Sequence, residues 1–130
     1  MIKRQRGFTL IELMVVMAII VVLAGIGTAM YTNSLTRSKE AVLKSDLFRM
    51  RDAIDQYYAD KNKYPASLQA LVDEKYLRGL PVDPFTNSAD TWQTVNAEPD
   101  PSAPTAEVGV FDVKSGAQGM AIDGTSYADW

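Results

Sequence analysis

The most conspicuous pattern in this chain is a long hydrophobic stretch near its start. From Leu13 to Met30, eighteen residues, the only side chain with a polar group is that of Thr28. As a helix this stretch would be about 27 Å long, at about 1.5 Å per residue. That length is close to the roughly 30 Å of a bilayer's hydrocarbon core. The pattern therefore predicts a membrane-spanning helix.

A second pattern, with helical spacing, follows the first. No proline or glycine occurs from Tyr31 to Lys63. We expect one continuous helix from about Phe8 to Asp60, ended by Asn62, because asparagine tolerates the left-handed conformation at a helix C-terminus. Large apolar residues recur at spacings of four and three, so they share one helix face that would pack on a small domain: Leu43, Leu47, Met50, Ile54 and Tyr57.

The remaining residues predict a small domain of short elements. Ser67 can cap a short helix from about Leu68 to Glu74, which would turn Leu68, Leu71 and Val72 inward. The prolines at positions 81 and 84 exclude regular structure there. Residues 86–104 indicate a loop with one short strand at Trp92–Val95.

Two further strands are predicted toward the end of the chain, at Glu107–Val113 and Met120–Ile122. Residues 115–119 between them would form a turn or loop. Together the patterns predict an α+β fold, with a long N-terminal helix packed on a small antiparallel sheet.

The charge distribution limits the classes of protein to which this chain could belong. Residues 1–7 contain three basic and no acidic side chains, whereas residues 65–130 contain three basic and ten acidic ones, a balance of -7. The positive-inside rule then predicts a single-pass inner-membrane protein, with a cytoplasmic N-terminus and a periplasmic C-terminal domain. An acidic folded part argues against nucleic-acid binding.

The absence of histidine and cysteine excludes Cys/His zinc sites, thiol catalysis and disulfides. No pair of carboxylates is spaced as in a glycosidase, and no phosphate-binding glycine loop occurs. We therefore expect that this protein is not an enzyme. A membrane-anchored periplasmic enzyme or sensor is the alternative, since a Ser–Lys pair would need no histidine.

The apolar stretch could also belong to a secretory signal peptide, with Gly27-Thr28-Ala29 near a cleavage site. Such apolar regions usually run about 7–15 residues, so the length here favours a retained anchor. The carboxylate of Glu12 at the start of the stretch favours it too. If the chain were cut after Gly7, Phe8 would gain a protonated α-amino group. The Glu12 carboxylate of one subunit could then neutralise this amine of its neighbour.

The sequence Arg6-Gly7-Phe8-Thr9-Leu10-Ile11-Glu12, followed at once by the apolar stretch, resembles the class III signal of type IV pilins and type II secretion pseudopilins. The resemblance implies that a prepilin peptidase cuts after Gly7 and methylates Phe8, and that Glu12 pairs with a neighbour's N-terminus during assembly. It divides the chain into a leader, a membrane-spanning half-helix, a periplasmic half-helix and an α+β domain: 1–7, 8–30, 31–63 and 64–130.

Many relatives have a proline near the end of the apolar stretch, a region that Ala29 and its neighbours occupy in this chain, with Gly25 and Gly27 just before it. These glycines could let the helix bend or melt in a filament, or could simply allow close helix packing. Charged residues on the helix after residue 36 are interpreted either as a solvated face or as contacts between subunits: Arg37, Lys39, Glu40, Lys44, Arg49, Arg51, Asp52 and Asp55.

Later segments resemble the major pseudopilin of type II secretion in their order and spacing. They are Asn62-Lys63-Tyr64-Pro65, residues 76–85, the loop at 115–119 and Trp130. The resemblance implies a periplasmic filament that helps drive proteins through the outer membrane. Its partners would be copies of itself, minor pseudopilins, an inner-membrane assembly platform and, before assembly, membrane lipid. A type IV pilin or minor pilin, for adhesion, motility or DNA uptake, is the alternative, and the lack of cysteine argues against it.

The same resemblance implies a calcium site in the C-terminal loop, since calcium binds carboxylate, carbonyl and hydroxyl oxygens. Gln118 stands where relatives often have aspartate, and the loop is shorter than theirs. The alternative for Asp123-Gly124 is an ordinary turn. The candidate ligands are Asp112, Ser115, Asp123 and Asp129, with hydroxyls also at Thr125 and Ser126.

Overall fold

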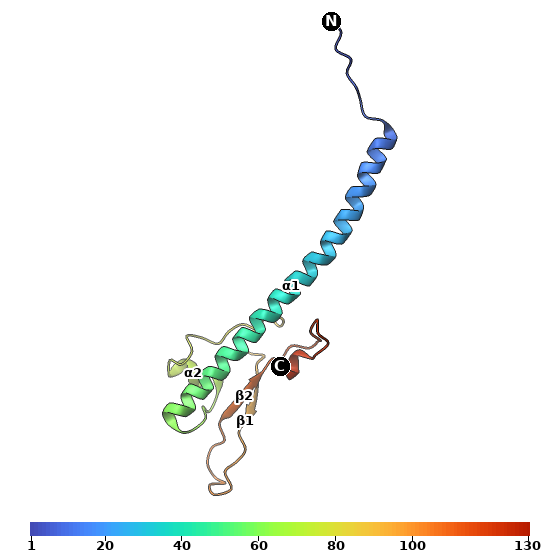
Figure 1. The fold of residues 1–130 in the computed structure, drawn as a ribbon. Helices are drawn as coiled ribbons and strands as arrows, with labels where there is room; N and C mark the ends of the chain where they lie inside the picture. Colours follow the sequence, from blue (N-terminus) through green and yellow to red (C-terminus); the bar gives the residue numbers. More distant parts are fainter. The chain divides into compact units, whose positions relative to one another are not determined.

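The computed structural model describes residues 1–130 as two compact units, residues 1–36 and residues 37–130. The elements are α1 (Leu10–Lys61), α2 (Leu68–Asp73), β1 (Gln93–Asn96), β2 (Val110–Lys114) and the short 3-10 helix η1 (Tyr127–Asp129) (Figure 1). Helix α1 contributes to both units. The predicted α+β fold, with one long N-terminal helix and a small antiparallel sheet, is confirmed.

The first unit consists of the start of α1 and the residues before it. Its apolar side chains are exposed throughout the predicted membrane stretch. The most apolar 18-residue window of α1 has a mean hydropathy of 2.7, so by length and composition this is the one helix that could cross a membrane. Apolar side chains without partners in their own chain need lipid or another protein surface to cover them.

Helix α1 ends one residue beyond the predicted position. Asn62 follows it with φ 54°, and the Asn62 main-chain N–H donates to the Tyr58 carbonyl at 2.8 Å. This is the left-handed C-terminal residue expected there, because the short polar side chain of asparagine tolerates that conformation.

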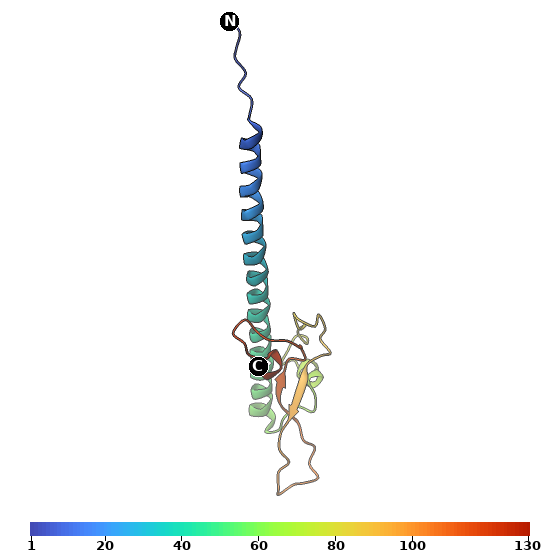
Figure 2. The same cartoon turned by 90° about the vertical axis from the view of Figure 1, so that its right-hand side faces the viewer.

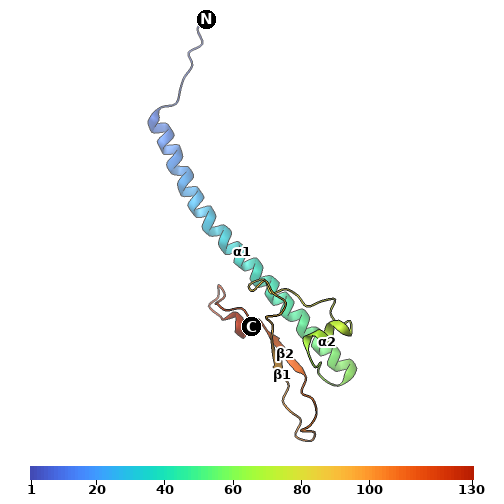
Figure 3. The ribbon, with the colours of Figure 1, turned by 180° about the vertical axis from the view of Figure 1, so that it is seen from behind.

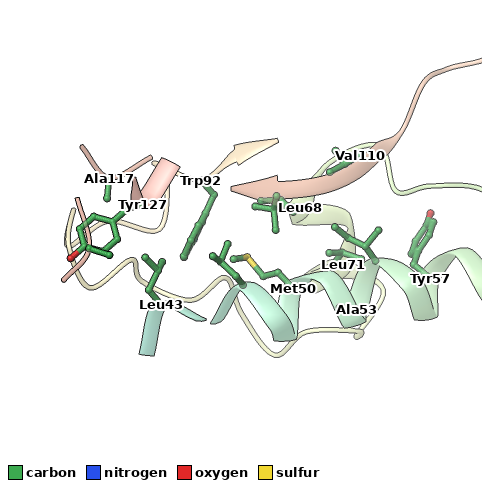
Figure 4. Close-up of a cluster of buried hydrophobic side chains, with 14 residues drawn as sticks. Leu43, Met50, Ala53, Tyr57, Leu68, Leu71, Trp92, Val110, Ala117 and Tyr127 are labelled. Atoms are coloured by element: carbon green, nitrogen blue, oxygen red, sulfur yellow. The ribbon is translucent and has the colours of Figure 1, made fainter. Parts of the chain in front are cut away.

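The core of the second unit is built on the predicted apolar face of α1. All five predicted residues are buried, and three of them are completely inaccessible to solvent. They pack against Trp92 and the inward side chains of α2 and β2, as Figure 4 shows. Fully burying a side chain of this size contributes about 1.5–3 kcal/mol, so this face contributes strongly to the stability of the second unit.

Helix α2 forms where predicted and lies beside the last turns of α1 (Figure 3). The Ser67 hydroxyl accepts a hydrogen bond from the Ala70 N–H at 3.3 Å, which satisfies one of the free donors at the start of a helix. Leu68 and Leu71 are buried as expected, whereas Val72 is only half-buried.

Strands β1 and β2 pair antiparallel, with Gln93 opposite Lys114 and an irregularity between Val95 and Asn96. The two strands lie beside the C-terminal part of α1, and the loop that joins them extends past their ends (Figure 2). Val110 and Val113 are the side chains of β2 that enter the core.

The predicted strand at Met120–Ile122 is wrong. Only an isolated bridge joins Met120 to Ser126. The chain turns back at once, because Gly119 and Gly124 have φ 130° and 88°, values that glycine adopts at little cost. The Ala121 N–H donates to the Thr125 carbonyl at 2.7 Å, which closes the turn.

Candidate functional site

The predicted cleavage point lies in an extended segment before α1. Residues 1–9 form no helix or strand, and Phe8 is 91% exposed. A Cβ atom added at Gly7 would meet no atom within 4 Å. The peptide bond after Gly7 is therefore open to approach by a peptidase, and its backbone need not unfold from any helix first.

Thr9 and Glu12 form a reciprocal capping box at the start of α1. The Glu12 N–H donates to Thr9 Oγ1 at 3.3 Å, and the Thr9 N–H donates to Glu12 Oε2 at 3.3 Å. The Thr9 hydroxyl also lies 3.4 Å from the same carboxylate oxygen. This arrangement satisfies two of the free N–H groups at the helix N-terminus.

The sequence interpretation missed this box, although the spacing Thr-x-x-Glu before an apolar stretch is its signature. The box holds one carboxylate oxygen of Glu12, while Oε1 has no hydrogen-bond partner and the side chain is exposed. Glu12 can thus cap its own helix and still offer an oxygen to a cation. Pairing with a neighbour's amine stays a prediction.

In the second unit, each predicted calcium ligand contacts a different partner within the chain. Asp112 Oδ1 accepts from Arg51 Nε at 2.7 Å. Ser115 donates from its hydroxyl to the buried Asp83 at 2.6 Å. Asp123 Oδ1 accepts from the Thr125 N–H and hydroxyl, at 3.0 and 2.6 Å.

Asp129 belongs to η1. Its main-chain oxygen lies 3.5 Å from Lys114 Nζ, and its carboxylate makes no hydrogen bond or ion pair. No three acidic side chains are placed together to hold a metal ion. As they lie in the structure, the four residues do not fit the calcium site that the resemblance implies.

Asp83 and Ser115 form a buried polar pair that the sequence did not reveal. Asp83 is inaccessible to solvent and Ser115 is 1% exposed. Asp83 Oδ1 also accepts from the Phe85 N–H at 2.8 Å and the Thr86 N–H at 3.4 Å. The carboxylate therefore fixes the two residues that follow Pro84 against the loop that follows β2.

Asp46, on the buried side of α1, is 8% exposed. Burial raises the pKa of its carboxyl group, and the nearby charge of Asp83 adds to this, while Arg49 acts in the opposite direction. Asp46 forms no salt bridge. Ionised Asp46 therefore lowers the free energy of unfolding, because a buried carboxylate without a paired cation is poorly solvated.

Three features together are typical of one class of protein, the type IV pilin-like filament subunits. They are the exposed apolar part of α1, the accessible Gly7–Phe8 bond and the Glu12 cap, in a chain that also has a small α+β domain. In agreement, residues 2–28 match the family model described as the prokaryotic N-terminal methylation motif. This motif indicates a substrate of prepilin peptidase.

Relatives extend the similarity well beyond the motif. Type II secretion system core protein G of Klebsiella pneumoniae is 35% identical over 99 residues, which are 64% of this chain and 71% of that protein. Core protein G of Pseudomonas aeruginosa is 35% identical over 101 residues, 65% and 71% of the two chains. The fimbrial protein EcpC of Eikenella corrodens is 37% identical over 83 residues, 60% of this chain and 54% of that protein.

This chain belongs to the family of type II secretion system core protein G, the major pseudopilins. No solved structure gives a significant match to it.

Proposed function

We propose that the mature chain, cut after Gly7 and methylated at Phe8, is the repeating structural subunit of a type II secretion pseudopilus. It would polymerise in the periplasm and help to move folded proteins across the outer membrane. Its role is mechanical and not catalytic. The energy would come from a separate ATPase.

The observation that carries this proposal is the exposed apolar part of α1 behind the Gly7–Phe8 bond. Its side chains have no partner within the chain, so lipid covers them before assembly and α1 helices of other subunits cover them afterwards. The three basic residues at positions 3, 4 and 6 support an N-terminus on the cytoplasmic side before cleavage.

The Glu12 carboxylate would favour the move of the subunit from the lipid bilayer into the filament. A carboxylate within an apolar helix is costly in the membrane, so a neighbour's protonated α-amine is a favourable partner. Minor pseudopilins and an inner-membrane assembly platform would start and extend the filament. The similarity to a fimbrial protein supports a second candidate, a type IV pilin or minor pilin.

The decisive experiment compares maturation and assembly in the native membrane. Intact mass should show a chain that begins at Phe8 with one added methyl group. Gly7→Leu should leave the full-length precursor, while Gln5→Leu, two residues away, should mature normally. A precursor of full mass in wild-type membranes, or normal maturation of Gly7→Leu, would refute processing by a prepilin peptidase.

Assembly is tested separately with Glu12→Val, which should be inserted and cut but should yield few filaments by electron microscopy. Glu107→Val, the same change at an exposed loop position, is the control. Normal filaments from Glu12→Val would refute the pairing role. Deletion of the gene should trap normally exported proteins in the periplasm, whereas loss of surface fibres with normal export would favour the pilin.

A further inference from the structure

Two charged side chains of α1 reach the last part of the chain, although both were interpreted from the sequence as surface charges. The first is Glu40, which is half-buried. Its Oε1 atom accepts from the Ile122 N–H at 2.9 Å and from the Tyr127 hydroxyl at 2.8 Å. Glu40 thus holds the turn after Gly119 and the start of η1 with one carboxylate.

The second is Arg51, whose guanidinium group contacts three acceptors. Nε donates to Asp112 Oδ1 at 2.7 Å, and Nη2 donates to the main-chain oxygens of Val113 at 2.9 Å and Trp130 at 2.5 Å. The planar guanidinium group suits such multiple contacts, and charge-assisted hydrogen bonds are stronger than neutral ones. Arg51 therefore ties strand β2 to the residue that follows η1.

Aromatic contacts fill the space between these two points. Tyr127 is 4% exposed, stacks on Phe85 with ring centres 4.2 Å apart, and meets Trp130 edge-on at 5.1 Å. Lys44 Nζ lies 4.5 Å from the centre of the Trp130 ring. Burial, with the Glu40 hydrogen bond, raises the pKa of Tyr127 to about 12.

We propose that Glu40 and Arg51 form a clamp that orders residues 112–130 without a metal ion, and that this chain does not need the calcium that its resemblance to pseudopilins implies. Three of the four predicted ligands already have partners within the chain, and only the Asp129 carboxylate has none. Arg51 neutralises Asp112, the Ser115 hydroxyl donates to Asp83, and Asp123 holds Thr125. Calcium would have to replace these partners with six to eight oxygens at 2.3–2.6 Å.

The first test measures thermal unfolding of the full chain in detergent, by tryptophan fluorescence, in 1 mM calcium and in 1 mM EGTA. Both tryptophans lie in the second unit. We expect melting temperatures that agree within about 1 °C. A site with a Kd of about 10 μM would instead raise the melting temperature by about 11–22 °C at 1 mM calcium, and a saturable increase of that kind would overturn the proposal.

The second test asks whether the clamp itself orders the segment, by amide hydrogen exchange in EGTA. Glu40→Ala should speed exchange of the Ile122 N–H at least tenfold, because the amide loses its acceptor. The Val110 N–H, which donates to the Pro65 carbonyl in the same unit, should stay protected, which separates local opening from global unfolding. Glu107→Ala is the matched control.

Arg51→Gln should likewise loosen residues 112–130, with Arg78→Gln, an exposed arginine without a salt bridge, as its control. Exchange of the Ile122 amide that is equally slow in Glu40→Ala and Glu107→Ala would refute the clamp. Recovery of protection in Glu40→Ala on adding calcium would show that the metal, and not the side chain, orders the segment.

Discussion

Asp83 offers the sharpest test of how the second unit is held together. Its carboxylate is inaccessible to solvent and accepts hydrogen bonds from the Phe85 and Thr86 N–H groups and the Ser115 hydroxyl. Asp83→Ala removes the shared acceptor and leaves these donors without a partner inside the protein. We expect it to be among the most destabilising single changes in the chain.

The size of the effect follows from the contacts. Hydrogen bonds to a charged group contribute about 1.5–3 kcal/mol each. The bonds from Phe85 and Ser115 are short, at 2.8 and 2.6 Å, whereas that from Thr86 is long, at 3.4 Å. Counting the two short bonds and subtracting the relief of no longer burying a charge, we expect a loss of about 3–4 kcal/mol. At about 4–8 °C per kcal/mol for a unit of this size, the melting temperature should fall by about 12–32 °C.

The assay is tryptophan fluorescence of the full chain in detergent during heating, with Asp90→Ala, an exposed aspartate, as control. Ser115→Ala should cost less than Asp83→Ala. The double variant should cost little more than Asp83→Ala alone, since the two residues share one interaction. A decrease below about 4 °C for Asp83→Ala, or full additivity with Ser115→Ala, would refute this account of the pair.

Other changes test single contacts by the same melting assay. Gly116→Ala should lower the melting temperature clearly, because the added Cβ would overlap the main-chain oxygen of Thr91 and relieving such crowding costs about 1–3 kcal/mol; an unchanged value would show that the loop can shift. Trp92→Phe should cost about 1–3 kcal/mol, because the Pro81 carbonyl loses the indole N–H that donates to it at 2.8 Å; a neutral effect would mean that water replaces the donor. Asp46→Asn should stabilise the chain at pH 7, because the raised pKa of Asp46 in the folded state means that folding becomes less favourable as this carboxyl group ionises. The gain in stability should vanish well below pH 3.8, the ordinary pKa, where Asp46 is protonated in both the folded and the unfolded state. A gain that persists at that pH would refute the charge explanation.

The helices could be predicted from the sequence because the signals for them are local. The spacing of the apolar residues selects the buried face of α1, Ser67 caps α2, and Asn62 adopts the left-handed conformation that ends α1. Each signal depends on residues at most a few positions apart. The Thr9–Glu12 box is of the same kind, and its sequence signature would have been sufficient to predict it.

The remaining features depend on contacts between residues far apart in the chain. Arg51 and Asp112 are 61 positions apart, and Ser115 and Asp83 are 32 apart. A charged residue on a helix has the same sequence appearance whether it is solvated or clamps a distant loop. The strand expected at Met120–Ile122 failed for a different, local reason, since the chain turns there through the left-handed backbone conformations of Gly119 and Gly124.

The two units differ in whether their apolar side chains are exposed or buried. Mutations in the first unit should therefore affect assembly, and mutations in the core of the second unit should affect stability. The first unit exposes them, so under the proposed function its changes should alter contacts with lipid or other subunits and leave the fold of the second unit unaffected. The second unit buries a cluster of them in a core of its own, so changes in that core alter how much folded chain exists. Glu12→Val should therefore melt like the wild type yet assemble poorly. Asp83→Ala should be processed at Gly7 normally yet be lost to proteolysis, because degradation of a membrane-anchored chain follows the fraction of its domain that is unfolded.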